Sequence, residues 1–363
     1  ARDVTVLKKH EQRIARLSRI HEVLSGINSA IVRIRDRQKL LEAACRIAVE
    51  SGGFGIAWAG LLDFGTLVVT PDASAGLEAD SFLSTSANTA STGSPLGRGM
   101  VGTALREKRV AFSNDIASED LSTGGERRKE ALRRGYRSVV VLPLLVEDVA
   151  MGSMSLFARE PGFFDEEEIK LLTGLADDIS FALEGIQRQK QFEKLSRIRS
   201  VSAEINAAIV RMRERDALLK EACRIASEHG KFEMIWIGTV DSSKEEIRAV
   251  AWAGFSEDIA HRVSWKSTTT AQGTLSEAIR TRQPAVRNDL EKLPGGGMRN
   301  EALSRGCLST VCLPLVVDDE VVALITLFAA GKDFFDKDEL LLLDEVAADI
   351  SFALQSIARQ AKD

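Results

Sequence analysis

The amino-acid sequence contains one long internal repeat, and this repeat limits the folds that the chain can adopt. Residues 17–54 align with residues 195–232 at an offset of 178, and residues 162–183 return as residues 333–354 at an offset of 171. The second copy is therefore seven residues shorter than the first. A period of about 170 residues is far longer than a solenoid repeat and has the size of one domain. The repeat predicts two related domains in tandem.

The alignment also predicts the domain boundaries. We expect a leader helix, a first domain, a helical linker and a second domain, over residues 1–16, 17–187, 188–194 and 195–363. From residue 166 to residue 213 the helical pattern scarcely stops, so the last helix of the first copy is expected to continue as the first helix of the second. Helical patterns at both ends of the chain favour a piece of a longer protein.

The hydrophobic pattern predicts the same order of elements in each copy. Apolar residues at a spacing of three and four predict one helix over roughly 9–49. We expect strands over 54–63 and 66–74, a flexible loop over 84–95, a helix over 99–107, a strand over 109–114 and a helix over about 126–134. A tight hairpin around Glu147 and Asp148 and a closing helix complete the copy. This order is typical of the α+β class, with an antiparallel sheet, helices on one face and connecting loops on the other.

Composition excludes several classes of protein. The formal charge of −5 and the absence of a basic block argue against nucleic-acid binding. No apolar run reaches the roughly 20 residues that span a bilayer, and the charged N-terminus is not a signal peptide, so we expect a cytoplasmic protein without membrane contact. The four cysteines lack zinc-ligand spacing and are expected to be buried thiols in a reducing compartment.

An acid-rich segment closes each copy, as FFDEEEIKLL in the first and FFDKDELLLL in the second. Paired catalytic carboxylates or metal sites would require a polar cleft, whereas both segments run directly into apolar helical patterns. Asp165 and Glu168 have the spacing of a capping box, which Asp336 and Glu339 repeat. We therefore expect these residues to cap the closing helices.

Other polar motifs allow both a structural and a functional interpretation. GRGMVG at 97–102 has the glycine spacing of a dinucleotide-binding loop but lies in no βαβ unit, so a loop and helix start is favoured; an anion at that helix N-terminus stays open. The Asn-Asp pairs at 114–115 and 288–289 fit an Asx turn or a pocket mouth. Arg128 and Arg299 fit an anion clamp or exposed helical positions. Trp58 and Trp236 fit the core or a ligand platform.

The four histidines do not cluster, so neither a metal site nor a histidine-based triad is supported.

Taken together, these segments resemble tandem GAF domains over nearly the whole chain. The resemblance is carried by FGIAW, GRGMVGTALR, the strand ending in Asn-Asp, ALRRGYRSVVVLPL and FFDEEEIKLLTGLADDISFAL, and by their counterparts in the second copy. It is strongest for GAF domains of bacterial signalling proteins, which precede diguanylate cyclase, phosphodiesterase or histidine kinase domains. It implies a PAS/profilin-like fold, a helical dimerisation face and a small-molecule pocket on the opposite face of the sheet.

The resemblance, with the two tryptophan positions and the difference between copies at Ser74 and Trp252, gives a set of candidate ligand-binding residues. In the first copy they are Trp58, Asn114, Asp115, Arg128, Tyr136 and Ser138. In the second copy they are Trp236, Trp252, Asn288, Asp289, Arg299, Cys307 and Ser309.

Departures from better-known GAF types reduce the range of ligands that the chain is expected to bind. Asp115 and Asp289 replace the lysine of cyclic-nucleotide GAF domains, which leaves a cyclic nucleotide weakly supported. No pocket Cys-His pair suits a bilin, and no histidine in the core segment of the first copy suits haem. Tyr136 replaces Cys307 in the first copy, which argues against methionine sulfoxide reduction there. We expect no cofactor beyond an unidentified small-molecule ligand.

The expected function is therefore regulatory and not enzymatic. Heptad-like spacing along the terminal and linking helices favours a homodimer, through which a bound ligand would signal to a covalently attached output domain. A ligand-free spacer that only dimerises is the alternative, and a redox enzyme is a third. No set of nucleophile, base and orienting residue can be assembled from the sequence.

Overall fold

The computed structural model describes residues 2–85, 87–118, 125–244, 246–263, 273–293 and 296–360, without the side chains of residues 2–10 and 12. The chain divides into two compact units, Ala1–Gln189 and Lys190–Asp363, and each unit holds one copy of the repeat. The expected α+β class, with two antiparallel sheets and a long helix between the two halves, is confirmed.

The first unit is built on an antiparallel sheet with the strand order β3-β2-β1-β6-β5-β4. Its strands are β1 (Ile56–Leu62), β2 (Val68–Gly76), β3 (Asn88–Thr89), β4 (Ala111–Ser113), β5 (Ser138–Val146) and β6 (Val149–Ala158). The expected flexible loop over 84–95 is wrong in part. It contains β3, which pairs with β2, and the start of the 3-10 helix η1 (Pro95–Arg98), because Thr89 and Ala90 are buried beside the sheet.

The second unit has the strand order β8-β7-β11-β10-β9 among its described residues. Its strands are β7 (Met234–Asp241), β8 (Glu246–Ala253), β9 (Ala285–Arg287), β10 (Ser309–Val317) and β11 (Glu320–Ala329). The predicted hairpin is present in both units. In the first unit its turn residues, Glu147 and Asp148, adopt φ values of 49° and 59°, as a two-residue hairpin turn requires.

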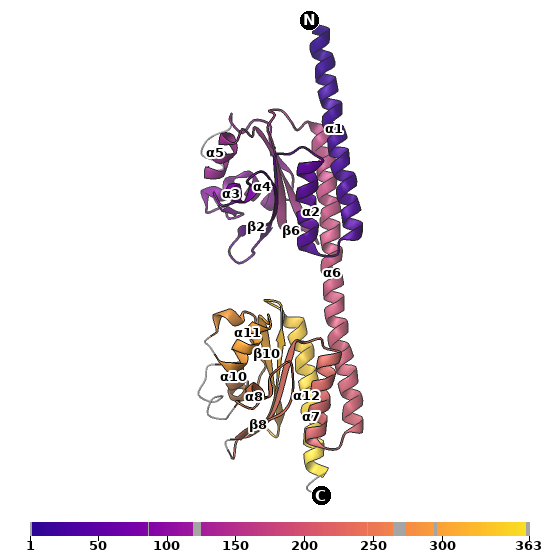
Figure 1. Cartoon of the computed structure of the whole chain (residues 1–363), viewed down its shortest axis with the longest axis vertical. Coiled ribbons are helices and arrows are strands. Elements are labelled where there is room, and N and C mark those ends of the chain that lie inside the picture. Colours follow the sequence, from indigo (N-terminus) through magenta and orange to yellow (C-terminus); the bar gives the residue numbers. More distant parts are fainter. Residues whose placement is uncertain are drawn as a thin grey trace. The chain divides into compact units, whose positions relative to one another are not determined.

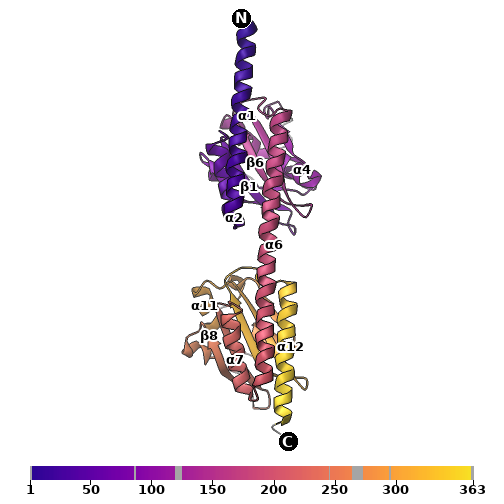
Figure 2. The ribbon, with the colours of Figure 1, turned by 90° about the vertical axis from the view of Figure 1, so that its right-hand side faces the viewer.

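Long helices cover one face of each sheet (Figures 1 and 2). They are α1 (Arg2–Arg33), α2 (Arg37–Glu50) and the first part of α6 (Glu166–Arg211) in the first unit. In the second unit they are the rest of α6, α7 (Arg215–Glu228) and α12 (Lys337–Gln360). Among the described helices, none is both long and apolar enough to cross a lipid bilayer.

The single helix expected over 9–49 is wrong, because the chain turns back at residues 34–36. Asp36 takes an extended conformation, and its carboxylate accepts a hydrogen bond from the Lys39 N–H at 3.0 Å, which caps α2. The turn places α1 and α2 on the same sheet. Ile20 and Ile27 are fully buried there, so part of the heptad-like stripe packs on its own domain.

Short helices cover the opposite face of each sheet, which was expected to carry the connecting loops (Figure 1). Two of them match the helices predicted over residues 99–107 and 126–134. In the first unit they are α3 (Ala79–Leu83), α4 (Met100–Glu107) and α5 (Gly125–Arg133). In the second unit they are α8 (Glu257–Ala260), α10 (Thr274–Thr281), η2 (Leu290–Lys292) and α11 (Gly297–Ser304). Each sheet therefore has an apolar core on both faces.

The acid-rich segments form helix caps, as expected. The Asp165 carboxylate accepts the Glu168 N–H at 3.1 Å, and the Glu168 carboxylate accepts the Asp165 N–H at 2.9 Å, which is a complete capping box. In the second unit Asp336 accepts the Glu339 N–H at 2.9 Å, while the Glu339 carboxylate lies 2.8 Å from the Lys194 ammonium. These carboxylates serve as helix caps and ion-pair partners.

Candidate ligand site

The first unit contains a cavity of about 410 Å³ between its sheet and the short helices α4 and α5. We call it the first cavity. Strand residues Trp58, Val141 and Ser155 form its floor, α5 supplies Arg127 and Arg128, and Gly99 and Met100 at the start of α4 lie at its edge. Its volume is within the range of small-molecule sites in proteins.

The floor of the first cavity is a row of side chains that crosses the sheet. Trp58 of β1 pairs with Ser155 of β6, Ser155 pairs with Val141 of β5, and Val141 pairs with Ala111 of β4. Residues directly opposite each other in antiparallel strands point to the same face. The strand register therefore brings residues from four separate segments of the chain to one surface.

Two polar groups of this floor are buried without a hydrogen bond. Trp58 and Ser155 are each 1 % exposed, and in the described part of the chain neither the Trp58 Nε1 nor the Ser155 Oγ has a partner. Buried polar groups in folded proteins are nearly always hydrogen-bonded, because leaving one unpaired costs about 1–3 kcal/mol. Both groups are therefore available to a bound molecule.

Arg127 forms the wall beside Trp58. Its guanidinium carbon lies 5.3 Å from the centre of the Trp58 ring and 5.6 Å from that of Phe82, and its Nη2 donates to the Leu83 carbonyl at 2.7 Å. Burial lowers the pKa of Arg127 to about 10, which still leaves the side chain cationic at neutral pH. The cation is thus held between two aromatic rings.

The charged side chains in the described lining of the first cavity are arginines. Four arginines line it, Arg98, Arg109, Arg127 and Arg128, whereas no aspartate or glutamate is among its described lining residues. Arg109 pairs with Glu107 at 2.6 Å outside the lining, and Arg98 is exposed.

A protein-family model described as GAF domain matches residues 34–184 and 213–355, which together make up most of the chain. The chain belongs to the GAF domain family. Each match lies within one copy of the repeat, so the two units are a first and a second GAF domain in tandem. No curated relative matches the sequence.

Several solved structures are similar to this chain at low sequence identity. The bacteriophytochrome RpBphP3 from R. palustris is 11% identical, with a TM-score of 0.52, over 93% of this chain and 76% of that one. A free methionine-R-sulfoxide reductase from Neisseria meningitidis, solved with its substrate, is 20% identical, with a TM-score of 0.39, over 47% of this chain and 91% of its own. A GAF domain of a phosphoenolpyruvate-protein phosphotransferase from Coxiella burnetii is 14% identical, with a TM-score of 0.40, over 47% and 96%.

In the first GAF domain, two of the six candidate residues from the sequence line the first cavity. They are Trp58 and Arg128, whose Nε donates to the Ile116 carbonyl at 2.7 Å. The other four are outside the lining. Asn114 holds the backbone of Phe164 with two hydrogen bonds, of 2.7 and 2.8 Å, and Ser138 donates to the Asn114 and Glu160 carbonyls.

The remaining two of these four also contact other parts of the protein. Arg137 donates to Asp115 at 2.8 Å, and this hydrogen bond holds the pKa of Asp115 below its usual value. Tyr136 is 2 % exposed and packs on Phe157. A ligand role for Asn114, Asp115, Tyr136 and Ser138 remains a prediction.

Sequence reasoning selected Arg128 and missed its neighbour Arg127, as well as Ser155. A signal for Arg127 exists in the repeat, because the second copy carries Met298 at the aligned position while Arg128 and Arg299 match. A buried cation that only one copy has is more informative about a ligand than an arginine that both copies share. Ser155 lies in an apolar strand pattern and becomes visible as a cavity residue only through the strand register.

The second GAF domain has the same row of strand residues with different side chains. Trp236 pairs with Thr326, and Thr326 pairs with Cys312. The Trp236 Nε1 donates to the Ala260 carbonyl at 2.9 Å, so this indole is satisfied by the protein itself. Trp252 replaces Ser74 beside it and contacts His261, with 4.8 Å between ring centres.

The other candidate residues of the second domain have structural contacts. Asn288 holds the backbone of Phe335 at 2.9 and 3.1 Å, as Asn114 holds that of Phe164. Ser309 donates to the Asn288 and Gly331 carbonyls, Asp289 accepts the Glu291 N–H, and Arg299 donates to the Leu290 carbonyl at 2.9 Å. Their ligand role, like that of Cys307, remains a prediction.

The cysteines are not activated. All four are buried, and desolvation raises the pKa of Cys307 to about 11 and that of Cys45, Cys223 and Cys312 to about 12. A thiol acts as a nucleophile only in its thiolate form, which is scarce at these pKa values. Among the described residues no cluster of three or more His, Cys, Asp or Glu could hold a metal ion.

Proposed function

We propose that this chain is the sensory region of a signalling protein, in which the first GAF domain binds a small molecule in the first cavity. The observation that carries the proposal is the pair of buried, unpartnered polar groups on its floor, the Trp58 Nε1 and the Ser155 Oγ. A ligand that bonds to both removes the cost of leaving them unpaired. Ligand binding therefore stabilises the domain.

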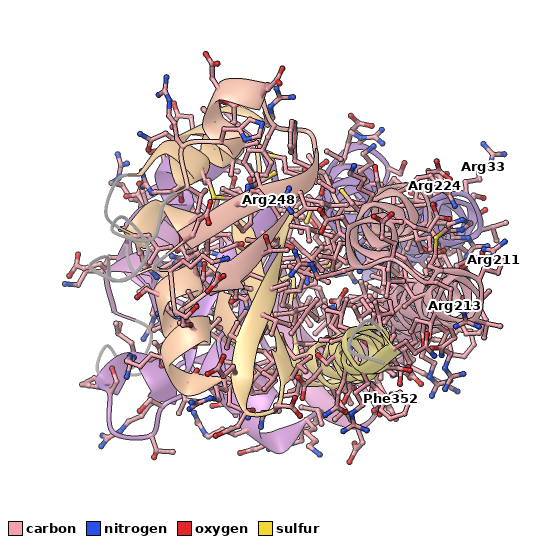
Figure 3. The ribbon with its side chains drawn as sticks, turned by 90° about the horizontal axis from the view of Figure 1, so that it is seen from below. Arg33, Arg211, Arg213, Arg224, Arg248 and Phe352 are labelled. Atoms are coloured by element: carbon pink, nitrogen blue, oxygen red, sulfur yellow. The ribbon has the colours of Figure 1, made fainter. Side chains whose placement is uncertain are left out.

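The same proposal includes a homodimer formed through the helical face. Large apolar side chains are exposed on these helices at equivalent positions of the two copies. Phe181 and Phe352 are 76 % and 73 % exposed, Val32 and Val210 are both 70 % exposed, and Ile14 and Phe192 are both 68 % exposed. Figure 3 shows Phe352 on the outer side of α12. Exposed apolar residues that recur in both repeats favour a contact with a second copy of the chain.

A route from the first cavity to α6 supports signal transmission. The cavity residue Arg128 donates to the Ile116 carbonyl, two residues from Asn114. Asn114 in turn holds the backbone of Phe164, and α6 begins at Glu166. We propose that a ligand in contact with Arg128 biases the position of residues 114–116, and through Phe164 the start of α6. An output domain on the same polypeptide would receive this change.

Two alternatives make different predictions. A ligand-free spacer would leave the Trp58 Nε1 unpaired and would show no small-molecule dependence. A redox enzyme of the methionine sulfoxide reductase kind needs a reactive thiol, and the raised pKa values of the buried cysteines argue against one.

The proposal is tested by the thermal stability of the purified chain in a fractionated metabolite extract. We expect a fraction that raises the melting temperature, since a ligand that binds only the folded state stabilises it. Ser155→Leu fills the first cavity and should abolish the shift, while Thr326→Leu, the matched change in the second domain, should retain it. A shift that Ser155→Leu leaves intact would place the ligand elsewhere, and no shift in any fraction would favour the spacer.

A further inference from the structure

We infer that the ligand of the first cavity is an organic molecule that accepts hydrogen bonds at two separate places, with a carbonyl oxygen at the Trp58 indole and a second acceptor at the Asn88 side-chain amide. This inference rests on the proposed ligand-binding function and deepens it by naming the chemical class. It is carried by the donors that face the first cavity, by their separation along the sheet, and by the partner that the second domain gives to its own indole.

Two of the unpartnered groups that face the first cavity can only donate hydrogen bonds. The Asn88 Nδ2 lines the same cavity as the Trp58 Nε1, is shielded from solvent, and has no hydrogen-bond partner in the described part of the chain. An indole N–H and an amide NH₂ are donors only, whereas the Ser155 hydroxyl can donate or accept. A bound molecule therefore satisfies the two nitrogen atoms only with acceptor atoms, and a ligand without acceptors would leave both unpaired.

The two donors are at separate places on the floor of the first cavity. Asn88 of β3 is opposite Val69 of β2. Val69 is opposite Leu62, which follows Trp58 by four residues in β1, so all four side chains point to the same face of the sheet. Two strand spacings and four residues place the α-carbons of Trp58 and Asn88 roughly 16 Å apart. A single small acceptor group does not span this distance, so the ligand needs two.

The rest of the ligand is expected to be largely apolar. Apart from the arginines, the described lining consists mainly of apolar side chains, among them Leu96, Val101, Val141 and Phe157. Such a surface stabilises a hydrocarbon or aromatic body by removing it from water. The volume of about 410 Å³ accommodates a body of this kind with an acceptor at each end.

The second GAF domain shows which acceptor such an indole takes. The Trp236 Nε1 donates to the carbonyl of Ala260, the last residue of α8, at 2.9 Å. At the offset of 178 the aligned residue of the first domain is Phe82 of α3, whose carbonyl accepts the Thr85 N–H at 3.4 Å. The Trp58 Nε1 thus lacks the backbone carbonyl that satisfies its counterpart. A carbonyl oxygen of the ligand takes the place of this backbone group.

Two pairs of probes test the two acceptors in the full chain. Acetophenone and isopropylbenzene have nearly the same shape, and only acetophenone has a carbonyl oxygen. The second pair, para-diacetylbenzene and para-isopropylacetophenone, differs in the same way at the other end of the ring. Binding is measured by calorimetry. We expect the member with the additional carbonyl to bind about fivefold to a hundredfold more tightly in each pair, because its partner leaves a buried donor unpaired.

Variants assign the two donors. Trp58→Phe removes the Nε1 but keeps an aromatic ring, and should abolish the preference for acetophenone over isopropylbenzene. Trp236→Phe, the matched change in the second domain, should retain it. Asn88→Asp keeps the shape of the side chain but replaces the donor by an acceptor, and should abolish the preference for para-diacetylbenzene. Asn300→Asp, at an exposed position of the second domain, is its control.

A second measurement does not depend on how well Trp58→Phe folds. In proton–nitrogen NMR spectra of the unmodified chain, acetophenone should move one tryptophan indole proton downfield, because a hydrogen bond to oxygen deshields the proton, whereas isopropylbenzene should not. Ser155→Leu, which fills the first cavity, should abolish the binding of all four probes and this shift.

The outcomes separate this inference from the function on which it rests. Equal affinities within each pair, at a site that Ser155→Leu removes, would overturn the acceptor inference and leave ligand binding in the first cavity intact. Tighter binding of para-diacetylbenzene to Asn88→Asp would overturn the second acceptor. If no probe binds, the inference is overturned, while a metabolite fraction that still stabilises the chain would preserve the proposed function. If no fraction stabilises it either, the proposed function fails as well.

Discussion

The guanidinium of Arg127 lies 5.3 Å from the ring centre of Trp58, at the wall and floor of a cavity that no described carboxylate lines. Arg127 and Trp58 contribute different properties to the cavity. The arginine supplies a buried positive charge, and the indole supplies a donor that has no partner in the described structure. The repeat provides an internal comparison, because the second GAF domain carries a methionine in place of Arg127 and pairs its own indole within the protein.

The asparagine contacts predict a local effect on the helices that close each domain. Asn114→Ala removes two hydrogen bonds to the backbone of Phe164, and Asn288→Ala removes the equivalent two to Phe335. Each change should destabilise the adjacent helix start by about 2–3 kcal/mol, since one hydrogen bond contributes about 1 kcal/mol and an orphaned backbone group adds more. Hydrogen exchange followed by mass spectrometry measures this at residues 164–172 and 335–343.

The surface variant Asn300→Ala is the control for both changes. If Asn114→Ala weakened ligand binding without faster exchange at the start of α6, Asn114 would be a ligand contact, as the sequence resemblance implies. Faster exchange at the start of α6, together with loss of the effect of the ligand on this helix start, would support the route from the first cavity to α6.

Glu168 predicts a pH dependence of stability. Its side chain is buried, and desolvation, reinforced by the neighbouring Asp165, raises its pKa above the usual value although Arg16 opposes the shift. Because the folded state holds the proton more tightly, the stability from this group is full below the unfolded pKa of about 4.3 and is lost as the pH rises through the folded pKa. Glu168→Gln carries no titrating proton at this position.

The melting temperatures of both proteins, recorded from pH 4.5 to pH 7, measure this effect. We expect the melting temperature of Glu168→Gln, relative to that of the unmodified chain, to increase as the pH rises. A difference that stays constant with pH, or changes in the opposite direction, would show that the carboxylate is ionised in the folded state throughout this range.

The cysteines are expected to be inert in the folded protein. Their burial and raised pKa values predict that a disulfide reagent at pH 8 reacts with none of the four thiols on the timescale of minutes, and with all four after denaturation. Absorbance of the released thiolate reports the reaction. Rapid modification of Cys307 in the native chain would revive the redox alternative for the second domain.

The exposed aromatic residues on the helices predict a dimer that charge can disrupt. Phe181→Glu places a carboxylate on the helical face and should convert a dimer to a monomer, or weaken it by at least about tenfold, because a buried unpaired charge is costly at an interface. Light scattering coupled to gel filtration gives the mass. Phe64→Glu, at a side chain that is 54 % exposed in the β1–β2 turn, is the control. A monomeric unmodified chain would contradict the dimer directly.

The sequence predicts the elements of this fold better than it predicts the site. Heptad-like spacing, the Glu147-Asp148 turn and the capping box are local patterns, and the structure contains the helices, hairpin and caps that they predict. The break at residues 34–36 was missed because Ile31 and Ile34 continue the apolar spacing as far as the break itself, and only the tertiary structure requires the chain to turn.

The cavity residues depend on the strand register, which sequence spacing does not reveal. Trp58, Ser155 and Val141 are far apart in the chain and meet only because β1, β6 and β5 are adjacent in the sheet. Arg127 and Arg128 are consecutive on a short helix, and which of them faces the tryptophan depends on how that helix packs. The aligned methionine of the second copy was the one available hint.

Native mass spectrometry of the chain after incubation with a metabolite extract tests the central claim most directly. We predict one adduct of a single defined mass for each chain, absent from Ser155→Leu and present in Thr326→Leu. An unmodified chain that carries no adduct, or an adduct that Ser155→Leu retains, would contradict the claim that the first cavity is a ligand site.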